Sequence, residues 1–258
     1  EMPVPTDTRT LYAPGRGARG AGEGRSVLDD DDDADIWDVG DVILDAYEVR
    51  RSDTGRDDGT HYAEGGMGVV YRVHHRGWDL DLAMKSPKAV SFDTEQGKRD
   101  FERECKTWIE LGLHPNIVSC YYVRRVDGIP RVFAEFVEGG SLEDWIRTGR
   151  LYEGGRDESL VRILDIAVQF AWGLHYAHEQ GLIHQDVKPG NVMMQGEVPK
   201  VTDFGLAKAR VAAARVSPDS TQASMVVSWG GMTPAFCSPE QIQAAVEAES
   251  GVSDDERT

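Results

Sequence analysis

The sequence of 258 residues is short of basic residues and of cysteine. Lys and Arg total 28 against 45 Asp and Glu, which gives a formal net charge of −17. A chain this acidic is not expected to bind nucleic acid or an anionic membrane through its main surface. The three cysteines form no CxxC pair, which argues against a zinc site or a disulfide framework and suits a reducing compartment.

Long apolar runs are missing as well. Residues 163–174 are the most apolar stretch, but they are too few to span a bilayer and include Asp165 and Gln169, so we expect a buried helix. The start of the sequence has no signal-peptide pattern, and we expect a cytoplasmic protein, with a membrane span beyond residue 258 left open. The hydrophobic content of 40% is enough for a real core.

Residues 1–41 offer little that could be buried. Residues 13–25 are rich in Gly, Arg and Ala, and residues 29–35 read DDDDDAD. Neither stretch can bury enough apolar area to offset the entropy of ordering, so we expect disorder over 1–41. A solvated linker is the favoured interpretation, and an electrostatic tether for a basic partner is the alternative.

After residue 41 the sequence changes first to strand patterns and then mostly to helix patterns. This order predicts an α+β fold of two lobes, a β-rich lobe with one helix at 42–137 and a helical lobe at 138–258. In the first lobe we expect strands within 42–50 and 68–86, a polar loop at 52–61, a helix in 94–111 and a hairpin over 116–137 that turns at Asp127-Gly128. In the second lobe we expect a short helix capped by Ser141 and Asp144, and a long helix over 159–180 that Gly181 ends.

Three glycines, Gly65, Gly66 and Gly68, lie between two of the expected strands. Backbone without a Cβ can approach a phosphate closely and present N–H groups to it. The same glycines suit an ordinary hairpin turn, and the motif alone does not decide between the two.

Lys85 ends an alternating strand in the stretch LAMK. It is either a surface charge or a buried ammonium that holds phosphate oxygens, and a buried ammonium needs a carboxylate partner. The next helix carries Glu102 and Glu104. Glu104 lies one turn from the apolar positions Phe101 and Trp108, so it is the expected partner.

A third motif lies in residues 181–193, GLIHQDVKPGNVM. Asp186, Lys188 and Asn191 follow a turn, and Pro189-Gly190 keeps the segment out of an α-helix. A carboxylate, an ammonium and an amide at this spacing can converge on one phosphoryl group, and the amide oxygen can bind a metal. Asp203, followed by Phe-Gly, offers a second hard oxygen ligand. Ordinary polar turns are the alternative at both places.

The order of these motifs carries more information than any one of them. A glycine loop, a strand Lys, a helix Glu, HxDxKxxN and DFG follow one another. Over about residues 43–241, the chain resembles the eukaryotic-like, bacterial-type Ser/Thr protein kinases. The resemblance implies an ATP-dependent protein Ser/Thr kinase that uses Mg²⁺ or Mn²⁺ and acts on protein hydroxyls, with no nucleic-acid partner.

The resemblance also implies a role for each matching residue. Asp186 would accept the proton of the substrate hydroxyl, Lys188 would contact the γ-phosphate, Lys85 would hold the α- and β-phosphates and pair with Glu104, and Asn191 and Asp203 would bind the metal. Gly65, Gly66 and Gly68 would cover the phosphates, Val70, Ala83 and Met193 would enclose the adenine, and Glu135 and Val137 would bind it through their backbones. Ala134 would guard the back of this pocket and leave unusual room there.

By the same resemblance, the activation segment runs from Leu206 to Thr233. In the family, the residue before the catalytic Asp is often an Arg that binds a phosphate on this segment. Here it is Gln185, which cannot form that ion pair, so we expect an enzyme that does not depend on the clamp. Lys188 and Thr233 resemble Ser/Thr rather than Tyr kinases, although Met232 replaces a usual Gly. Before Thr233, the segment holds five hydroxyl residues, Ser217, Ser220, Thr221, Ser224 and Ser228.

The resemblance ends soon after Glu240. The family's next long helices have no counterpart, so we expect an incomplete helical lobe, a fragment of a longer kinase that is poorly stable alone. Apolar faces should then be exposed near 141–148 and 159–180. Two alternatives remain: a pseudokinase scaffold that binds nucleotide without transfer, and a fragment that is inactive by itself.

Overall fold

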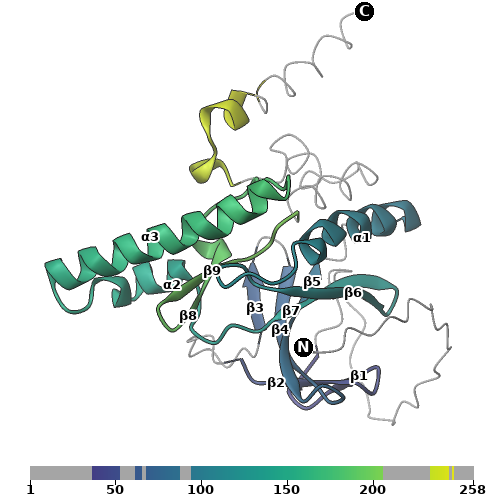
Figure 1. The fold of residues 1–258 in the computed structure, drawn as a ribbon. Helices are drawn as coiled ribbons and strands as arrows, with labels where there is room; N and C mark the ends of the chain where they lie inside the picture. Colours follow the sequence, from purple (N-terminus) through teal and green to yellow (C-terminus); the bar gives the residue numbers. More distant parts are fainter. Residues whose placement is uncertain are drawn as a thin grey trace, which may run out of the picture. The chain divides into compact units, whose positions relative to one another are not determined.

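The computed structural model describes residues 37–52, 62–65, 68–87, 94–205, 233–243 and 246. Within these residues the first lobe is a seven-stranded antiparallel sheet with the order β1-β2-β4-β5-β7-β6, and β3 pairs with β4 beside this path (Figure 1). The strands are β1 Val42–Ile43, β2 Tyr47–Arg50, β3 Tyr62–Gly65, β4 Gly68–His75, β5 Leu80–Pro87, β6 Cys120–Val126 and β7 Ile129–Glu135.

Turns with left-handed residues connect several of these strands. Asp127 and Gly128, with φ of 51° and 77°, turn β6 into β7 and confirm the predicted hairpin. Leu44 and Asp45, with φ of 51° and 56°, divide the predicted strand region 42–50 into the paired strands β1 and β2. The strand patterns in the sequence were therefore correct, and local turns set the register of the sheet.

Alternation along the strands places one face of the sheet in a core. The buried positions of β4 and β5 include Tyr71, Leu82 and Met84, and the residues between them are half-buried. Phe133 of β7 lies in the same core, with its ring centroid 4.7 Å from that of Tyr47. The aromatic side chains on this face pack in a core, so a ligand would contact the opposite face of the sheet.

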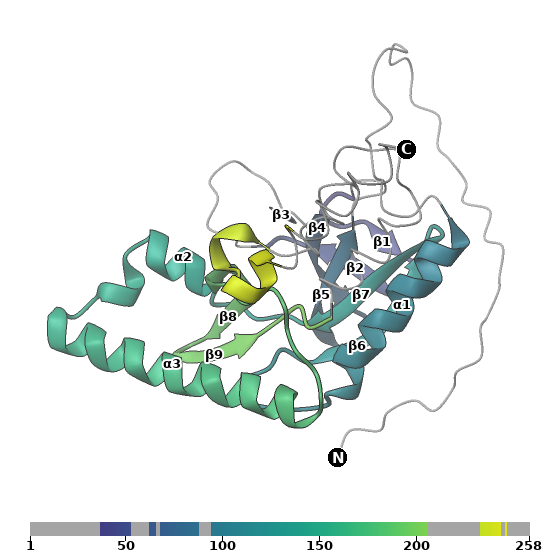
Figure 2. The ribbon, with the colours of Figure 1, turned by 90° about the horizontal axis from the view of Figure 1, so that it is seen from above.

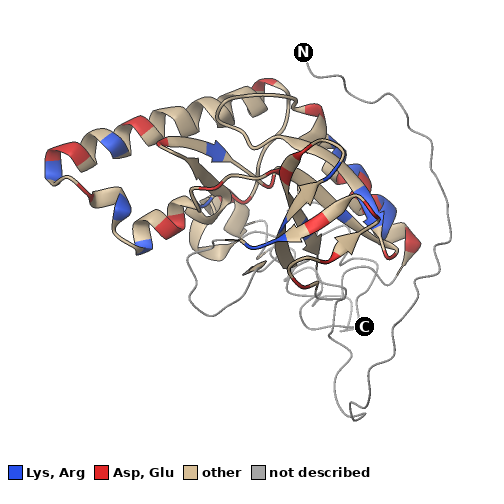
Figure 3. Ribbon diagram, turned by 90° about the horizontal axis from the view of Figure 1, so that it is seen from below, with Lys and Arg blue, Asp and Glu red and all other residues tan. Residues whose placement is uncertain are grey.

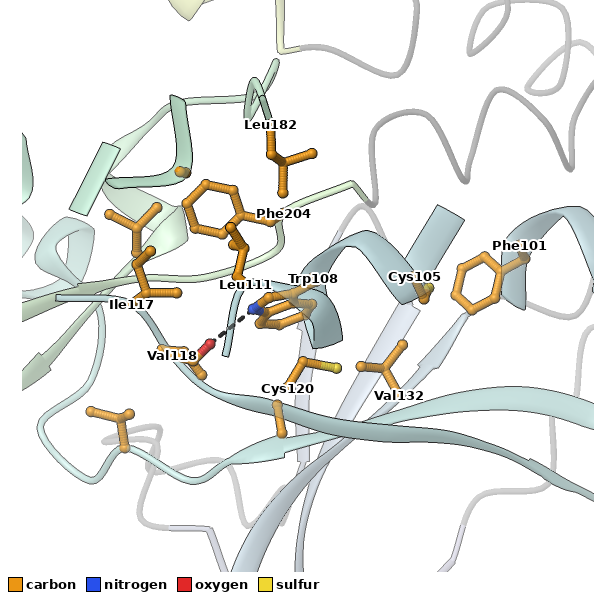
Figure 4. Close-up of a cluster of buried hydrophobic side chains, with 14 residues drawn as sticks. Phe101, Cys105, Trp108, Leu111, Ile117, Val118, Cys120, Val132, Leu182 and Phe204 are labelled. Carbon is orange, nitrogen blue, oxygen red and sulfur yellow. Dashed lines mark hydrogen bonds between the residues drawn. The ribbon is translucent and has the colours of Figure 1, made fainter. Parts of the chain in front are cut away.

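Helix α1, Glu95–Glu110, packs against β6 and β7 and buries Phe101, Cys105 and Trp108 (Figure 4). These positions are three and four residues apart, and their burial confirms the predicted helix and its inward face. Thr94 caps the helix by accepting a hydrogen bond from the Gly97 N–H at 3.1 Å. The inward face of α1 also comes near β5, where Lys85 Nζ lies 5.9 Å from the centroid of the Trp108 ring.

Charged residues of both signs are interspersed along α1 and over the sheet (Figure 3). Arg125 of β6 reaches Glu95 and Glu102 of α1, at 2.7 and 2.6 Å. Because these ion pairs are exposed to solvent, their contribution to stability is small. Together they orient Glu102 toward β6.

The second lobe contains α2, Leu142–Arg147, and α3, Arg156–Glu179, with α3 packed beside the hairpin of β8 and β9 (Figure 2). The predicted capping box of Ser141 and Asp144 is present, and Gly181 ends α3 with φ of 74°. Helix α3 starts three residues before its predicted start at 159, with Asp157 and Glu158 in its favourable first turn. The remaining elements are η2 Arg150–Tyr152, η3 Pro189–Asn191, β8 Val192–Gln195, β9 Val198–Val201 and η4 Pro234–Phe236.

One side of α3 exposes large apolar side chains, as the resemblance implies, so the buried helix expected over 163–174 is wrong: only the side with Ile166 and Gly173 is covered. The exposed fractions of its most accessible large apolar residues lie between 49% and 67%. None of the described helices is long and apolar enough to cross a membrane. The residues concerned are Leu160, Val161, Leu164, Val168 and Trp172.

The boundary expected at residue 41 was wrong by a few residues. Trp37 packs edge-on against Tyr71, with ring centroids 5.3 Å apart, and lies 4.2 Å from the Arg131 guanidinium. The backbone of Gly40 and Asp41 pairs with Val49 at 2.9 Å in both hydrogen bonds. The contacts of the large Trp37 ring order this short segment although its neighbours are acidic, so residues 37–41 belong to the first lobe. Residues 1–36 lie outside the described part.

Candidate active site

His184 anchors the loop that carries the candidate catalytic residues. Its buried ring lies 4.7 Å from that of Phe204, and its Nε2 is 2.7 Å from the carbonyl oxygen of Thr202. The Asp186 N–H donates to His184 Nδ1 at 3.3 Å. Burial lowers the pKa of His184 because it disfavours the charged ring. This neutral ring therefore links the Asp186 loop to the segment of Asp203.

Asp186 is 4% exposed and surrounded by donors. Asn191 Nδ2 donates to its Oδ2 at 3.2 Å, Lys188 Nζ lies 2.8 Å from the same atom, and Thr233 donates from its N–H and Oγ1 to Oδ1 at 3.0 and 2.8 Å. Burial alone would raise the pKa of Asp186, but the hydrogen bonds from Lys188 and Thr233 outweigh it and hold the pKa below its ordinary value. Asp186 is therefore an ionised acceptor at neutral pH.

Asn191 and Asp203 are the candidate metal ligands. The Nδ2 of Asn191 donates to the Asp186 carbonyl at 2.8 Å, which directs the amide oxygen elsewhere. Residues 189–191 form a short 3₁₀ turn, so the segment stays out of an α-helix as predicted. Asp203 has a left-handed φ of 71° and accepts a hydrogen bond from Thr202 Oγ1 at 3.1 Å.

The expected ion pair between Lys85 and Glu104 does not form. Lys85 Nζ pairs with Asp203 Oδ1 instead, while Glu104 lies 3.6 Å from Arg103. The turn at 203–205 lies directly against α1: a Cβ on Gly205 would come within 2.7 Å of Thr107 Oγ1 and 2.9 Å of the Glu104 carbonyl. This close approach brings the buried carboxylate of Asp203 to the half-buried ammonium of Lys85, and each supplies the countercharge of the other.

The predicted adenine-binding residues share one face of the sheet. Val70 lies opposite Lys85 in the β4–β5 register, and Ala83 is two residues before Lys85, so all three side chains point the same way. Ala134, at the back of this face, is buried and lies directly opposite Ala83. The structure thus brings together the strand residues that the sequence motifs named separately.

Met193, Glu135 and Val137 lie at the junction of the lobes. Met193 of β8 is half-buried and forms a bridge to Ser141, and Val137 is buried. The Glu135 N–H donates to the Ser119 carbonyl at 2.8 Å, so this N–H is already bonded within the first lobe. These positions are compatible with an adenine held between the two lobes.

Comparison with known families matches residues 59–253 to the protein kinase domain. The chain belongs to this family. A probable serine/threonine-protein kinase of Clostridium perfringens is 36% identical over 181 residues, which cover 70% of this chain and 24% of that protein. A second, from Streptomyces coelicolor, is 32% identical over 205 residues, covering 76% of this chain and 28% of that protein. The chain thus spans about a quarter of the length of these curated relatives.

A solved structure supports the fold assignment. The PknI kinase domain of Mycobacterium tuberculosis, in a mutant form, matches with a TM-score of 0.50 and 23% identity, covering 70% of this chain and 75% of that chain. The two-lobed kinase fold expected from the sequence is therefore confirmed, and the relatives above confirm the bacterial-type Ser/Thr kinase family.

The glycine loop of this kinase chain is partly described. Gly65 ends β3 and Gly68 begins β4, and the two are paired across the turn. Gly68 has φ of 124°, a conformation that favours glycine. Gly66 lies outside the described residues, so its predicted contact with phosphate stays a prediction.

Thr233 is a site residue that the sequence pattern gives only as typical of Ser/Thr kinases. Its hydroxyl accepts from Lys188 Nζ at 2.6 Å and donates to Asp186. The 45 and 47 residues that separate it from Lys188 and Asp186 hide this contact from any local pattern. The TP dipeptide at 233–234, after a glycine-rich stretch, was the available signal.

Gln185 has a left-handed φ of 68°, and its carbonyl accepts a hydrogen bond from Gln241 Nε2 at 3.0 Å. The residue thus has a backbone role in joining the catalytic loop to the segment after the activation loop. Residues 206–232, with Met232 and all five hydroxyl residues of the activation segment, lie outside the described part. The prediction that activity needs no Arg–phosphate clamp therefore stays a prediction.

Proposed function

We propose that the protein containing this chain transfers the γ-phosphoryl group of ATP to Ser or Thr hydroxyls of protein substrates. The observation that carries the proposal is that Lys188 and Thr233 contact each other and both contact the carboxylate of Asp186. Family membership supports the same reaction. Because the chain spans only part of its relatives, the proposal concerns the full-length protein.

In this proposal Asp186 orients the substrate hydroxyl and accepts its proton. Its low pKa keeps it ionised, and its four donors fix the carboxylate orientation. Lys188 is 2.8 Å from this carboxylate and can also reach the transferring phosphoryl group, whose negative charge it would stabilise. Positioning and charge stabilisation are the main contributions a protein makes to this type of reaction.

The donor set fits a hard divalent cation. Asp203 supplies a carboxylate and Asn191 an amide oxygen, and Mg²⁺ commonly takes one or two such ligands together with substrate phosphates. Among the described residues no group of three or more His, Cys, Asp or Glu forms a self-sufficient metal cluster, which favours a metal bound with the nucleotide. We propose Mg²⁺, with Mn²⁺ as a substitute; when bound, the metal would neutralise phosphate charge.

The cysteines support a cytoplasmic location for this domain. Cys105, Cys120 and Cys237 are all free thiols, as expected in a reducing compartment. Burial raises the pKa of Cys105 and raises that of Cys120 to about 12, so both are unreactive. A pool of ATP is available in the same compartment.

Radiolabel transfer from γ-labelled ATP to a generic basic protein tests the proposal. We expect label on Ser and Thr, strict dependence on Mg²⁺ or Mn²⁺, and a loss of at least about hundredfold in Asp203→Asn. The matched control is Asp165→Asn, an exposed carboxylate on α3. Nucleotide binding without any metal-dependent transfer would instead support the pseudokinase scaffold.

A further inference from the structure

Glu135 and Lys200 form an ion pair beside the segment that connects the two lobes. Lys200 Nζ donates to Glu135 Oε1 at 2.6 Å, and the side chains of Lys200 and Glu135 are only 12% and 19% exposed. The Ser119 N–H donates to the other carboxylate oxygen at 3.2 Å. Glu135 ends β7 in the first lobe, and Lys200 belongs to β9 in the second, so this pair connects the lobes.

The pair lies in a cleft of about 370 Å³ that His114 and Tyr121 also line. Lys200 is directly opposite Met193 in the β8–β9 register, so its side chain points to the same side of the hairpin as Met193. The backbone nearby is fixed as well, since the Val118 N–H donates to the Val201 carbonyl at 2.8 Å. The ion pair therefore belongs to an ordered junction.

A second ion pair also joins the two lobes, but here the anion comes from the second lobe and the cation from the first. Lys200 gives a cation from the second lobe to an anion of β7, while Asp203, three residues later, gives an anion to Lys85 of β5. Strands β5 and β7 are neighbours, with Leu82 opposite Glu135 and Lys85 opposite Val132. Residues 200–203 are thus held against the sheet at both ends.

The two pairs differ in what Mg·ATP would do to them. In the proposed function, Lys85 binds phosphates and Asp203 binds the metal, so the nucleotide and its metal compete with their mutual ion pair. The proposed function uses neither the side chain of Glu135 nor that of Lys200, so their pair does not have to open. It remains as the contact that holds the Asp203 segment in register with the hinge backbone.

We propose that the side chains of Glu135 and Lys200 are positioning groups that couple the adenine end of the nucleotide site to its metal end. The inference rests on the proposed function and deepens it. The backbone of Glu135 would hold adenine, its side chain holds Lys200, and Lys200 lies three residues before Asp203. Breaking the pair should weaken a ligand that bridges both ends and leave a ligand of the adenine end unaffected.

The test compares binding of Mg·ATP and of adenosine to the full-length protein by calorimetry. Lys200→Met keeps the length of the side chain and removes the charge. We expect it to weaken Mg·ATP binding about tenfold, the order expected for a lost charge-assisted hydrogen bond, with adenosine affinity unchanged. Glu197→Gln, on the same hairpin in an exposed pair with Arg162, is the matched control and should change neither affinity.

A charge exchange separates positioning from general damage. The double variant Glu135→Lys with Lys200→Glu should recover most of the Mg·ATP affinity, whereas each single reversal should not. Equal loss of adenosine and Mg·ATP affinity in Lys200→Met, or no recovery in a folded double variant, would overturn the inference. Failure of the unaltered protein to bind Mg·ATP more tightly than adenosine would overturn the proposed function as well.

Discussion

Replacing Thr233 with Val tests whether its hydroxyl organises the catalytic carboxylate. The change keeps the shape of the side chain and removes the donor to Asp186 Oδ1 at 2.8 Å and the acceptor for Lys188 at 2.6 Å. Hydrogen bonds to charged groups contribute about 1.5–3 kcal/mol. The Thr233 N–H still donates at 3.0 Å, so we take the lower part of that range, about 1.5–2 kcal/mol. This corresponds to a fall in kcat/KM of roughly ten- to thirtyfold.

The pH dependence supplies a more specific signature. Burial raises the pKa of Asp186, and the hydrogen bonds from Lys188 and Thr233 lower it by more. Removing the Thr233 hydroxyl removes one of the lowering contributions, so the pKa of Asp186 must rise. Because the ionised carboxylate is the active form, the acidic limb of the kcat/KM profile should move to higher pH.

The assay is kcat/KM for phosphoryl transfer measured across the acidic range in Thr233→Val and Thr233→Ser. Serine keeps the hydroxyl and should preserve the position of the acidic limb. An acidic limb that stays in place in Thr233→Val, with activity within twofold of the unaltered protein, would refute the assigned contact.

Three further predictions concern regulation, stability and the turn after Asp203. Replacing the five hydroxyl residues of the activation segment before Thr233 (Ser217, Ser220, Thr221, Ser224 and Ser228) with Ala should keep kinase activity within tenfold, and a larger loss would show that phosphorylation there is required. Trp108→Ala removes a buried ring bonded to the Val118 carbonyl and should lower the free energy of unfolding by about 3–5 kcal/mol in denaturant titrations. Gly205→Ala should reduce transfer more than Gly112→Ala, because both positions have positive φ but only a Cβ at 205 meets Thr107 and α1; equal effects would contradict the contact.

Local sequence rules recovered much of this fold. The inward face of α1, the Asp127-Gly128 turn and the Ser141 capping box each depend on residues within a few positions of one another, and each was predicted. The prediction of disorder up to residue 41 was wrong because it rested on the average composition of 1–41, in which the acidic tract outweighs the single Trp37. A single large aromatic residue can order a short segment that its neighbours alone could not.

The sequence predicted which residues form the site better than it predicted which of them form ion pairs. The residues of the catalytic loop and Asp203 were named from spacing, but the partner of Lys85 was not. Helix periodicity correctly placed Glu104 beside the inward face of α1, yet it could not show that the turn at Gly205 approaches α1 and brings Asp203 to Lys85. Contacts across 118 residues depend on how the lobes meet, which no local pattern encodes.

The central claim is that Asp186 serves phosphoryl transfer, and it is tested most directly by comparing the full-length protein with its Asp186→Asn variant. The measurement is the rate of label transfer from γ-labelled ATP, with Mg·ATP affinity measured in parallel. The proposed role predicts a loss of about 10²–10⁴-fold in transfer with little change in nucleotide affinity, because the substitution keeps the side-chain volume and removes the proton acceptor. Equal transfer by the two proteins would contradict the assignment of Asp186.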